Sequence, residues 1–239
     1  MIRLNKYIAN AGVCNRREAD KLILSGKIMV NGQVVTILGT KVNVEDKVEY
    51  NGKLLTNKKF QYILLNKPKG FYTSLDGPVN NKTPLNLIGN SIQEQLFPVG
   101  ELDVETMGLL LITNDIELAK RVSDSEQKIN EKYILHLDKE MDSETLELLK
   151  KGIKLKERVY CFDKVHYGDK GENKKKLIVT ISHRTKNIIS RLIEHLGYKV
   201  ITLDRIEFHT LKKGSLSRGK WRLLTAKEIG FFKMIKDSS

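Results

Sequence analysis

The chain has 239 residues, and 40% of them are hydrophobic, which is enough for one domain of ordinary size and a small second domain with buried cores. Its 42 lysine and arginine residues outnumber 29 acidic residues, and the net charge of +13 favours a polyanion as partner. Two distant cysteines exclude a disulfide framework, and no apolar stretch approaches the length of a membrane span. The N-terminus also lacks an apolar leader, so we expect a monomeric, cytoplasmic protein without a membrane partner.

The first sixty residues predict two short helices followed by a small sheet. Apolar residues recur at helical spacing on one face of the first helix, at Leu4, Tyr7, Ile8 and Ala11. Gly12 ends that helix, and Asn15 with Glu18 three residues later is typical of a capping box at the start of the second. The second helix has its apolar stripe at Ala19, Leu22 and Ile23.

Two Asn-Gly pairs predict hairpins in the small sheet. Asn31-Gly32 separates the apolar run 28–30 from Val34 and Val35, and Asn51-Gly52 follows Val48 and Tyr50. Asn-Gly between apolar runs favours a tight two-residue turn, because both residues accept a positive φ.

Basic side chains gather around the second helix. Residues 1–60 carry 11 basic and 5 acidic side chains, a net charge of +6. From charge alone, this face could follow a phosphate backbone or simply be solvated. Three runs resemble the S4 RNA-binding domain over about residues 1–50: Arg3-Leu4-Asn5-Lys6-Tyr7-Ile8, Ala11-Gly12-Val13-Cys14-Asn15-Arg16-Arg17-Glu18-Ala19-Asp20 and Gly26-Lys27-Ile28-Met29-Val30-Asn31-Gly32. The resemblance implies RNA-phosphate contacts for Lys6, Arg16, Arg17, Lys21 and Lys27.

The second part of the chain begins with a strand-like run. Tyr62-Ile63-Leu64-Leu65 predicts a buried strand that stops near Pro68, and Thr83-Pro84-Leu85 predicts a helix start. We therefore divide the chain into an S4-like domain (1–53), a polar linker (54–60) and a larger domain (61–239).

The segment 97–115 carries the candidate chemistry. A polar loop between Gly100 and Gly108 holds three acids and leads into an apolar strand, where partial desolvation would suit a reactive carboxylate. By spacing alone, an acidic surface turn is the alternative. The run Gly100-Glu101-Leu102-Asp103, followed by Thr106 and Gly108-Leu109-Leu110, is similar to the catalytic-aspartate motif of small-subunit ribosomal RNA pseudouridine synthases. That resemblance implies that Asp103 is the catalytic aspartate.

Further segments resemble the same family in the same order, so that the likeness spans about residues 1–230. They are Asn66-Lys67-Pro68-Lys69-Gly70, Glu131-Lys132-Tyr133-Ile134, Leu196-Gly197-Tyr198-Lys199-Val200, Leu203-Asp204-Arg205-Ile206, and the closing residues Gly214, Leu216, Gly219, Trp221, Arg222 and Leu224-Thr225. The resemblance implies an α/β (α+β) fold with a mostly antiparallel central sheet flanked by helices. It also implies that Tyr133 packs against the target base and that Asn66, Lys67 and Arg191 bind substrate.

Two positions depart from the family pattern. Glu101 stands where the family has an arginine, and Thr185 stands where a basic partner of the aspartate is expected. Arg184 or Lys186 could replace that partner only if the local register shifts. If Glu101, Asp103 and Glu105 share one face, they would raise each other's pKa.

The resemblance implies isomerisation of a specific uridine in ribosomal RNA to pseudouridine. Asp103 could attack the sugar or remove a sugar proton, and the residues leave both routes open. The five histidines lack ligand spacing, so we expect no metal and no cofactor. The partner would be ribosomal RNA or an assembling ribosomal subunit. A catalytically impaired RNA-binding or ribosome-assembly factor remains the alternative, while a DNA-binding regulator is disfavoured because no helix-turn-helix pattern is present.

Overall fold

The computed structural model describes residues 1–43, 45–56, 60–73, 82–89, 92, 95–124, 127–182 and 187–235. The chain separates into two compact units, Met1–Phe60 and Gln61–Ser239, and each is described by itself.

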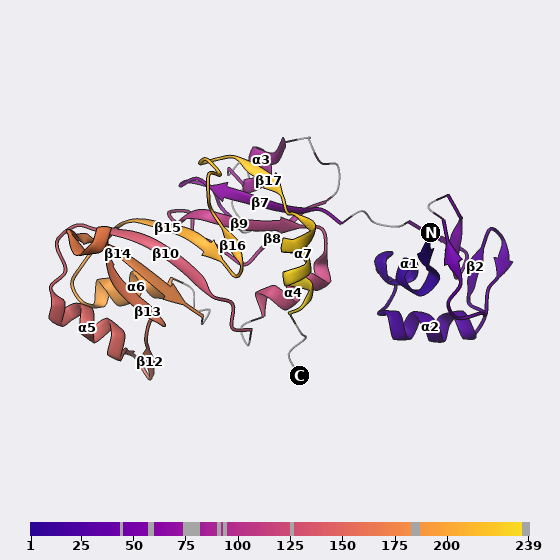
Figure 1. The fold of residues 1–239 in the computed structure, drawn as a ribbon, viewed down its shortest axis with the longest axis horizontal. Helices are drawn as coiled ribbons and strands as arrows, with labels where there is room; N and C mark the ends of the chain where they lie inside the picture. The colour runs from indigo at the N-terminus through magenta and orange to yellow at the C-terminus, as the bar shows by residue number, and fades with distance from the viewer. Residues whose placement is uncertain are drawn as a thin grey trace. The chain divides into compact units, whose positions relative to one another are not determined.

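The first unit combines two helices with short strands (Figure 1). Its elements are β1 (Ile2–Arg3), α1 (Leu4–Asn10), α2 (Arg16–Leu24), β2 (Ile28–Val30), β3 (Gln33–Val34), β4 (Lys41–Val42), β5 (Val48–Tyr50) and β6 (Lys53–Leu55). One antiparallel sheet has the order β3-β2-β5-β6, and β1 pairs separately with β4. The helices bury Leu4, Tyr7, Ile8, Ala19 and Ile23 against Ile28, Val42 and Val48.

The local signals of this unit are confirmed. The side chain of Asn15 accepts a hydrogen bond from the Glu18 amide at 2.9 Å, and Glu18 accepts from the Asn15 amide at 3.3 Å, which completes the capping box. Asn31 and Asn51 have φ of 51° and 50°, as their hairpin turns require.

The predicted linker begins too early. Leu54 and Leu55 lie in β6 and pair with β5, with Val48 opposite Leu55. The Asn51-Gly52 turn brings the chain straight back along β5, so these two leucines belong to the first unit rather than to a connecting segment.

The second unit contains one large sheet with helices beside it (Figure 1). Its strands are β7 (Tyr62–Lys67), β8 (Phe97–Val99), β9 (Met107–Thr113), β10 (Glu131–Leu137), β11 (Ile153–Leu155), β12 (Arg158–Tyr160), β13 (Lys164–Gly168), β14 (Asn173–Ile181), β15 (Val200–Phe208), β16 (Leu211–Lys212) and β17 (Trp221–Leu223). Its helices are α3 (Pro84–Ile88), α4 (Ile116–Ser123), α5 (Ser143–Lys151), α6 (Ile188–His195) and α7 (Ala226–Lys233), with a 3-10 turn η2 (Asp169–Gly171).

The large sheet has the order β13-β14-β10-β15-β9-β7-β17, with β8 on β9 and β16 on β15. Among the described strand pairs of this sheet, β9 with β15 is parallel and the others are antiparallel, which confirms the mostly antiparallel sheet. Figure 1 shows α5 and α6 on one side of β10 and β14. Their apolar residues, among them Leu146, Leu192 and Ile193, share one core with Leu135 and Val179 of those strands.

Candidate active site

Asp103 lies in the loop that connects β8 to β9. The loop is fixed by hydrogen bonds to the segment that follows β7. The Thr73 hydroxyl donates to the Leu102 carbonyl at 2.8 Å and accepts from the Leu102 amide at 3.2 Å. The Gly70 amide donates to the Val104 carbonyl at 2.8 Å. Both neighbours of Asp103 are therefore held through their backbone, and the half-buried Asp103 has a defined position.

Gly108 closes this loop and permits a close approach of two strands. It faces Arg205 in the parallel pairing of β9 with β15, and its φ is +112°. A Cβ atom at this position would lie 2.2 Å from the Arg205 carbonyl oxygen. This clash could be relieved only if the backbone of one of the two strands moved. Glycine is required here both by the positive φ and by the space.

A cleft of about 720 Å³ opens beside Asp103. One wall is the Asp103 loop with residues 69–73, and the opposite wall comes from α6 and the start of β15. The lining residues are Lys69, Tyr72, Thr73, Glu101, Leu102, Asp103, Val104, Glu105, Thr106, Asn187, Ser190, Glu194, Lys199, Val200, Ile201 and Leu203. Because clefts of this size commonly hold small organic ligands, a nucleoside has room beside the carboxylate.

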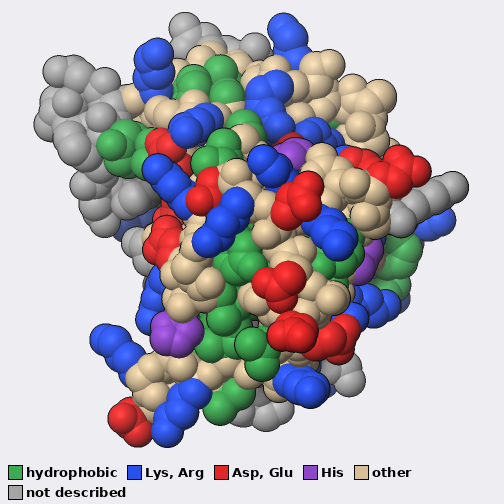
Figure 2. Space-filling view, turned by 90° about the vertical axis from the view of Figure 1, so that its left-hand side faces the viewer, with side chains coloured by type: hydrophobic (Ala, Val, Ile, Leu, Met, Phe, Trp, Pro, Cys, Tyr) green, Lys and Arg blue, Asp and Glu red, His purple; other side chains and the backbone are tan. Residues whose placement is uncertain are grey.

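The cleft is richer in acids than the chain as a whole. Glu101, Asp103, Glu105 and Glu194 line it, whereas its described lysines are Lys69 and Lys199. Lys69 pairs with Glu105 at 2.6 Å, but both side chains are more than half exposed, so this ion pair adds little stability. Figure 2 shows acidic and basic side chains interspersed on the face of the molecule that it presents. Among the described lining residues of the cleft, acids outnumber lysines, so the described part of the cleft does not share the net positive charge of the chain.

Lys67 lies beneath the Asp103 loop and is fully buried. Its ammonium group donates to the carbonyl oxygens of Phe71 at 2.9 Å, Pro68 at 3.2 Å and Val104 at 3.5 Å. Burial lowers the pKa of Lys67 to about 8, and the nearby carboxylate of Asp103 opposes that shift. Lys67 thus supports the backbone of the loop, whereas the sequence predicted a substrate contact.

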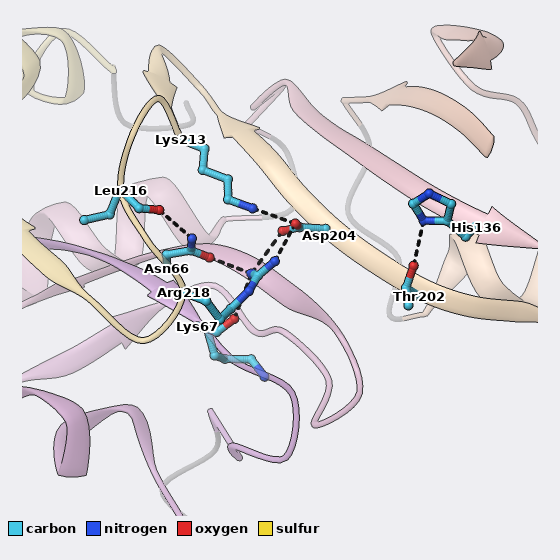
Figure 3. A network of polar contacts seen from close by, with 8 residues as sticks. All are labelled: Asn66, Lys67, His136, Thr202, Asp204, Lys213, Leu216 and Arg218. Atoms are coloured by element: carbon cyan, nitrogen blue, oxygen red, sulfur yellow. Dashed lines mark hydrogen bonds and ion pairs between the residues drawn. The ribbon is translucent and has the colours of Figure 1, made fainter. Parts of the chain in front are cut away.

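Asn66 is also fully buried, at the end of β7. Its amide group donates to the Leu216 carbonyl at 2.7 Å, and its side-chain oxygen accepts from Arg218, as Figure 3 shows. Neither Asn66 nor Lys67 is among the described residues that line the cleft. A direct substrate contact by either residue stays a prediction that this arrangement does not favour.

Tyr133 lies in the core of the second unit and is 6% exposed. Its hydroxyl donates to the Glu131 carboxylate, which also pairs with Arg205 at 3.0 Å. Burial, followed by the Glu131 charge, raises the pKa of Tyr133 above its ordinary value. Tyr133 is not among the described lining residues of the cleft, so its contact with the target base stays a prediction that this arrangement does not favour.

The buried pair of Glu131 and Arg205 was missed from the sequence. Arg205 is 1% exposed, its Nε donates to the Leu109 carbonyl at 2.8 Å, and its guanidinium lies 4.4 Å from the ring centre of Phe208. A signal was present, because each charged residue occupies an inward position among alternating apolar residues of its strand. Sequence spacing could not show that the two charges meet across the sheet.

Arg191 lies exposed on α6, and its helix neighbours Ser190 and Glu194 line the cleft instead. Glu101 is exposed in the cleft wall, close in sequence to the half-buried Asp103. The candidate partners Arg184, Thr185 and Lys186 lie outside the described residues.

In the first unit, the five predicted RNA-contacting side chains, Lys6, Arg16, Arg17, Lys21 and Lys27, are all exposed. Lys6 and Arg16 also line a shallow hollow of about 300 Å³ together with Met1, Ile2, Arg3, Asn5 and Lys41. No acidic residue is among these lining residues. Sequence reasoning missed Arg3 and Lys41, because β1 and β4 pair across 37 intervening positions.

Comparisons with known proteins agree with this two-unit arrangement. Residues 2–48 match the S4 domain family, and residues 61–220 match the family described as RNA pseudouridylate synthase. The chain therefore belongs to the RNA pseudouridylate synthase family and carries an S4 domain.

Similar proteins cover nearly the whole chain. An uncharacterized RNA pseudouridine synthase of Aquifex aeolicus is 39% identical over 95% of this chain and 92% of that protein. Ribosomal large subunit pseudouridine synthase B of Bacillus subtilis is 35% identical over 99% and 98%. The dual-specificity RNA pseudouridine synthase RluF of Escherichia coli K12 is 32% identical over 100% of this chain and 81% of that protein.

A solved structure, a crystal structure of a pseudouridylate synthase, aligns with a TM-score of 0.64 and 27% identity over 97% of this chain and 100% of that chain. The family and the fold are as the sequence resemblance implied. The small-subunit subtype is not supported by these relatives, which are named for the large subunit or for dual specificity.

None of the described helices has the length and hydropathy needed to cross a bilayer. Within the same residues, no group of three or more His, Cys, Asp and Glu side chains is arranged to hold a metal ion.

Proposed function

We propose that this chain isomerises a uridine of ribosomal RNA to pseudouridine, with Asp103 as the catalytic carboxylate. The observation that carries the proposal is the placement of Asp103. It is half-buried in the wall of a nucleoside-sized cleft, on a loop whose backbone is held from two neighbouring residues. A reacting carboxylate must keep its geometry through the reaction, and such a loop provides that.

The reaction breaks the C1′–N1 bond of uridine, turns the uracil and joins C5 to C1′, while C5 loses a proton and N1 gains one, so that the product is an isomer of the substrate. A uridine stacked in a duplex cannot reach the cleft, so the target must be offered from a loop or be flipped out. Within the cleft, Asp103 would attack C1′ or remove a sugar proton. Both routes use an ionised carboxylate and need no metal or cofactor.

The first unit would supply affinity for the RNA. Its exposed basic side chains and the acid-free hollow around Arg3, Arg16 and Lys41 fit a phosphate backbone. The substrate would be ribosomal RNA, either free or in an assembling subunit. The name of the Bacillus relative makes the large subunit the first place to search for the target, ahead of the small-subunit type that the motif resembled.

A second candidate function is RNA binding without catalysis, as in a ribosome-assembly factor. The observation that favours it is the acidic cleft, in which Glu101, Glu105 and Glu194 accompany Asp103. These carboxylates would repel the phosphates that flank a bound uridine.

Pseudouridine-specific sequencing of ribosomal RNA from cells with and without the gene separates the two functions. A single uridine that is modified with the gene and unmodified without it, and that the purified chain modifies again, supports the isomerase. An identical modification pattern in both cell types, with assembly intermediates accumulating in the deletion, would support the binding factor.

A further inference from the structure

A network of polar side chains joins the loop after β16 to the end of β7 and to the middle of β15 (Figure 3). The Asp204 carboxylate accepts hydrogen bonds from Lys213 at 2.7 Å and from Arg218 at 2.6 and 3.2 Å. The same guanidinium donates to the side-chain oxygen of Asn66 and to the Lys67 carbonyl at 3.2 Å. Arg218 thus bridges two strands that do not pair with each other.

The strand between these two is β9, which leads directly out of the Asp103 loop. In the register of the sheet, Met107 faces Asp204, and Gly108 faces Arg205 on one side and Lys67 on the other. The bridge by Arg218 therefore spans β9 at the residue where the loop ends. At this point β9 and β15 pack so closely that a Cβ atom on Gly108 would lie 2.7 Å from the Asp204 carboxylate.

A continuous set of contacts leads from Arg218 to the residue next to Asp103. Arg218 binds the Lys67 carbonyl, and the Lys67 ammonium reaches the Val104 carbonyl at 3.5 Å. The Gly70 amide, three residues beyond Lys67, donates to the same carbonyl at 2.8 Å. A displacement of the end of β7 would thus move Val104, and Asp103 with it.

The environment of the Asp204 carboxylate keeps it charged and paired with both cations. Its side chain is 18% exposed, so solvent screens its ion pairs less than those of a surface carboxylate. Burial by itself would raise the pKa of Asp204, but the hydrogen bonds from Arg218 and Lys213 outweigh burial and hold that pKa below its ordinary value. Asp204 is therefore ionised at neutral pH and keeps both cations.

We propose that Arg218 and Asp204 are positioning residues that hold the Asp103 loop in register for catalysis. The inference rests on the proposed function, since it assigns a role in the chemistry of Asp103. Arg218 would act through the end of β7 and the middle of β15, without touching the substrate.

The test compares Arg218→Lys with Arg222→Lys in the full-length protein. Lysine keeps the charge but cannot form two parallel hydrogen bonds to one carboxylate. Arg222 is a matched control because it makes a bidentate pair with Glu228, at 2.7 and 2.8 Å, in the same C-terminal segment and away from the network of Figure 3. The measurements are the single-turnover rate on a ribosomal RNA transcript, the Kd for that RNA, the melting temperature, and hydrogen exchange of residues 100–108.

For Arg218→Lys we expect the single-turnover rate to fall about tenfold to a hundredfold, because a misplaced reacting group loses rate on this scale. The Kd for RNA should stay within about twofold, since Arg218 lies outside the described cleft lining. Exchange within residues 100–108 should accelerate. Arg222→Lys should leave rate and exchange unchanged even if its melting temperature falls equally. Adding Asp204→Asn to Arg218→Lys should cost less than the sum of the two separate losses, because both changes weaken the Arg218–Asp204 pair, and only the Lys213 pair is lost in addition.

The inference would be overturned if folded Arg218→Lys showed the hydrogen exchange and the single-turnover rate of the wild type. It would also be overturned if Arg222→Lys lost as much rate and protection from exchange as Arg218→Lys. An inactive wild-type chain would contradict the proposed function instead. In that case the exchange of residues 100–108 alone decides whether Arg218 holds the loop.

Discussion

The two hollows of this chain differ in the charge of their described lining residues, as the proposed division between RNA binding and chemistry would require. The hollow of the first unit is lined by Arg3, Lys6, Arg16 and Lys41 without an acid, whereas the cleft of the second unit contains more acids than described lysines. A positive surface attracts RNA over a long distance but does not distinguish one RNA sequence from another, because all phosphates carry the same charge. An acidic cleft repels the phosphates of RNA, so a nucleotide would enter it only if another part of the protein supplied the binding energy. The net charge of +13 alone could not reveal this separation.

The largest effect is expected when the carboxylate of Asp103 is removed from the cleft. Asp103→Asn keeps the size of the side chain, so we expect product formation to fall at least about a thousandfold while RNA affinity is retained. Single-turnover assays and filter binding with one transcript measure the two quantities. Glu105→Gln, an exposed residue of the same cleft wall, should stay within a few-fold of wild type. Equal rates for Asp103→Asn and wild type would remove Asp103 from the chemistry.

The next test changes the sign of one charge in the cleft. Glu101→Arg removes an exposed acid beside Asp103 and restores the residue type of the family motif. A charged hydrogen bond is worth on the order of 2–3 kcal/mol, so we expect turnover on a loop substrate to rise about 30-fold or more. Glu101→Gln, which removes the negative charge without adding a cation, should give a smaller gain. A fall in turnover with both variants would mean that Glu101 has a role of its own.

A smaller effect is expected from the basic hollow. The double variant Arg16→Ala/Lys41→Ala removes two cations of the hollow, so RNA affinity should drop several-fold at low salt. The slope of log K against log salt should become shallower by about one to two, since each lost phosphate contact contributes about one. Lys154→Ala, an exposed lysine on β11, is the control. An unchanged slope in the double variant would locate RNA binding elsewhere.

The smallest effect concerns the core rather than either hollow. Tyr133→Phe removes the hydroxyl that donates to buried Glu131, and we expect the free energy of unfolding to fall by about 1–2 kcal/mol. Urea unfolding measures this loss, and the single-turnover rate per folded molecule should stay at the wild-type level. Unchanged stability with a reduced rate would instead support the predicted contact between Tyr133 and the base.

Local features of the fold could be predicted from the sequence. The Asn15–Glu18 capping box and both Asn-Gly turns are formed by residues within a few positions of each other, so the sequence contains all of the necessary information. The same holds for the helix start at Thr83-Pro84 and for the apolar strand β9.

The surroundings of the candidate site could not be predicted in this way. Asn66 meets its partners 150 and 152 positions later in the chain, and Arg205 meets Glu131 across 74 positions. The resemblance placed Asn66, Lys67 and Tyr133 near the substrate, but it could not show that all three are buried. Burial depends on how the strands assemble, and that assembly is a property of the whole sheet.

The parallel pairing of β9 with β15 has a mechanical consequence. In the sheet ladder, it joins β7, β8, β9 and β17 to β10, β13, β14 and β15 through two residue pairs, Asp204 with Met107 and Arg205 with Gly108. The loop of Asp103 leads into one of these half-sheets, while Glu194 and Ser190 lie on a helix packed against the other. Side chains reinforce this short seam, because Arg218 links Asp204 to the end of β7 and Arg205 donates to the Leu109 carbonyl. The relative position of the two cleft walls is therefore held by a short backbone ladder together with side chains that lie outside the described cleft lining.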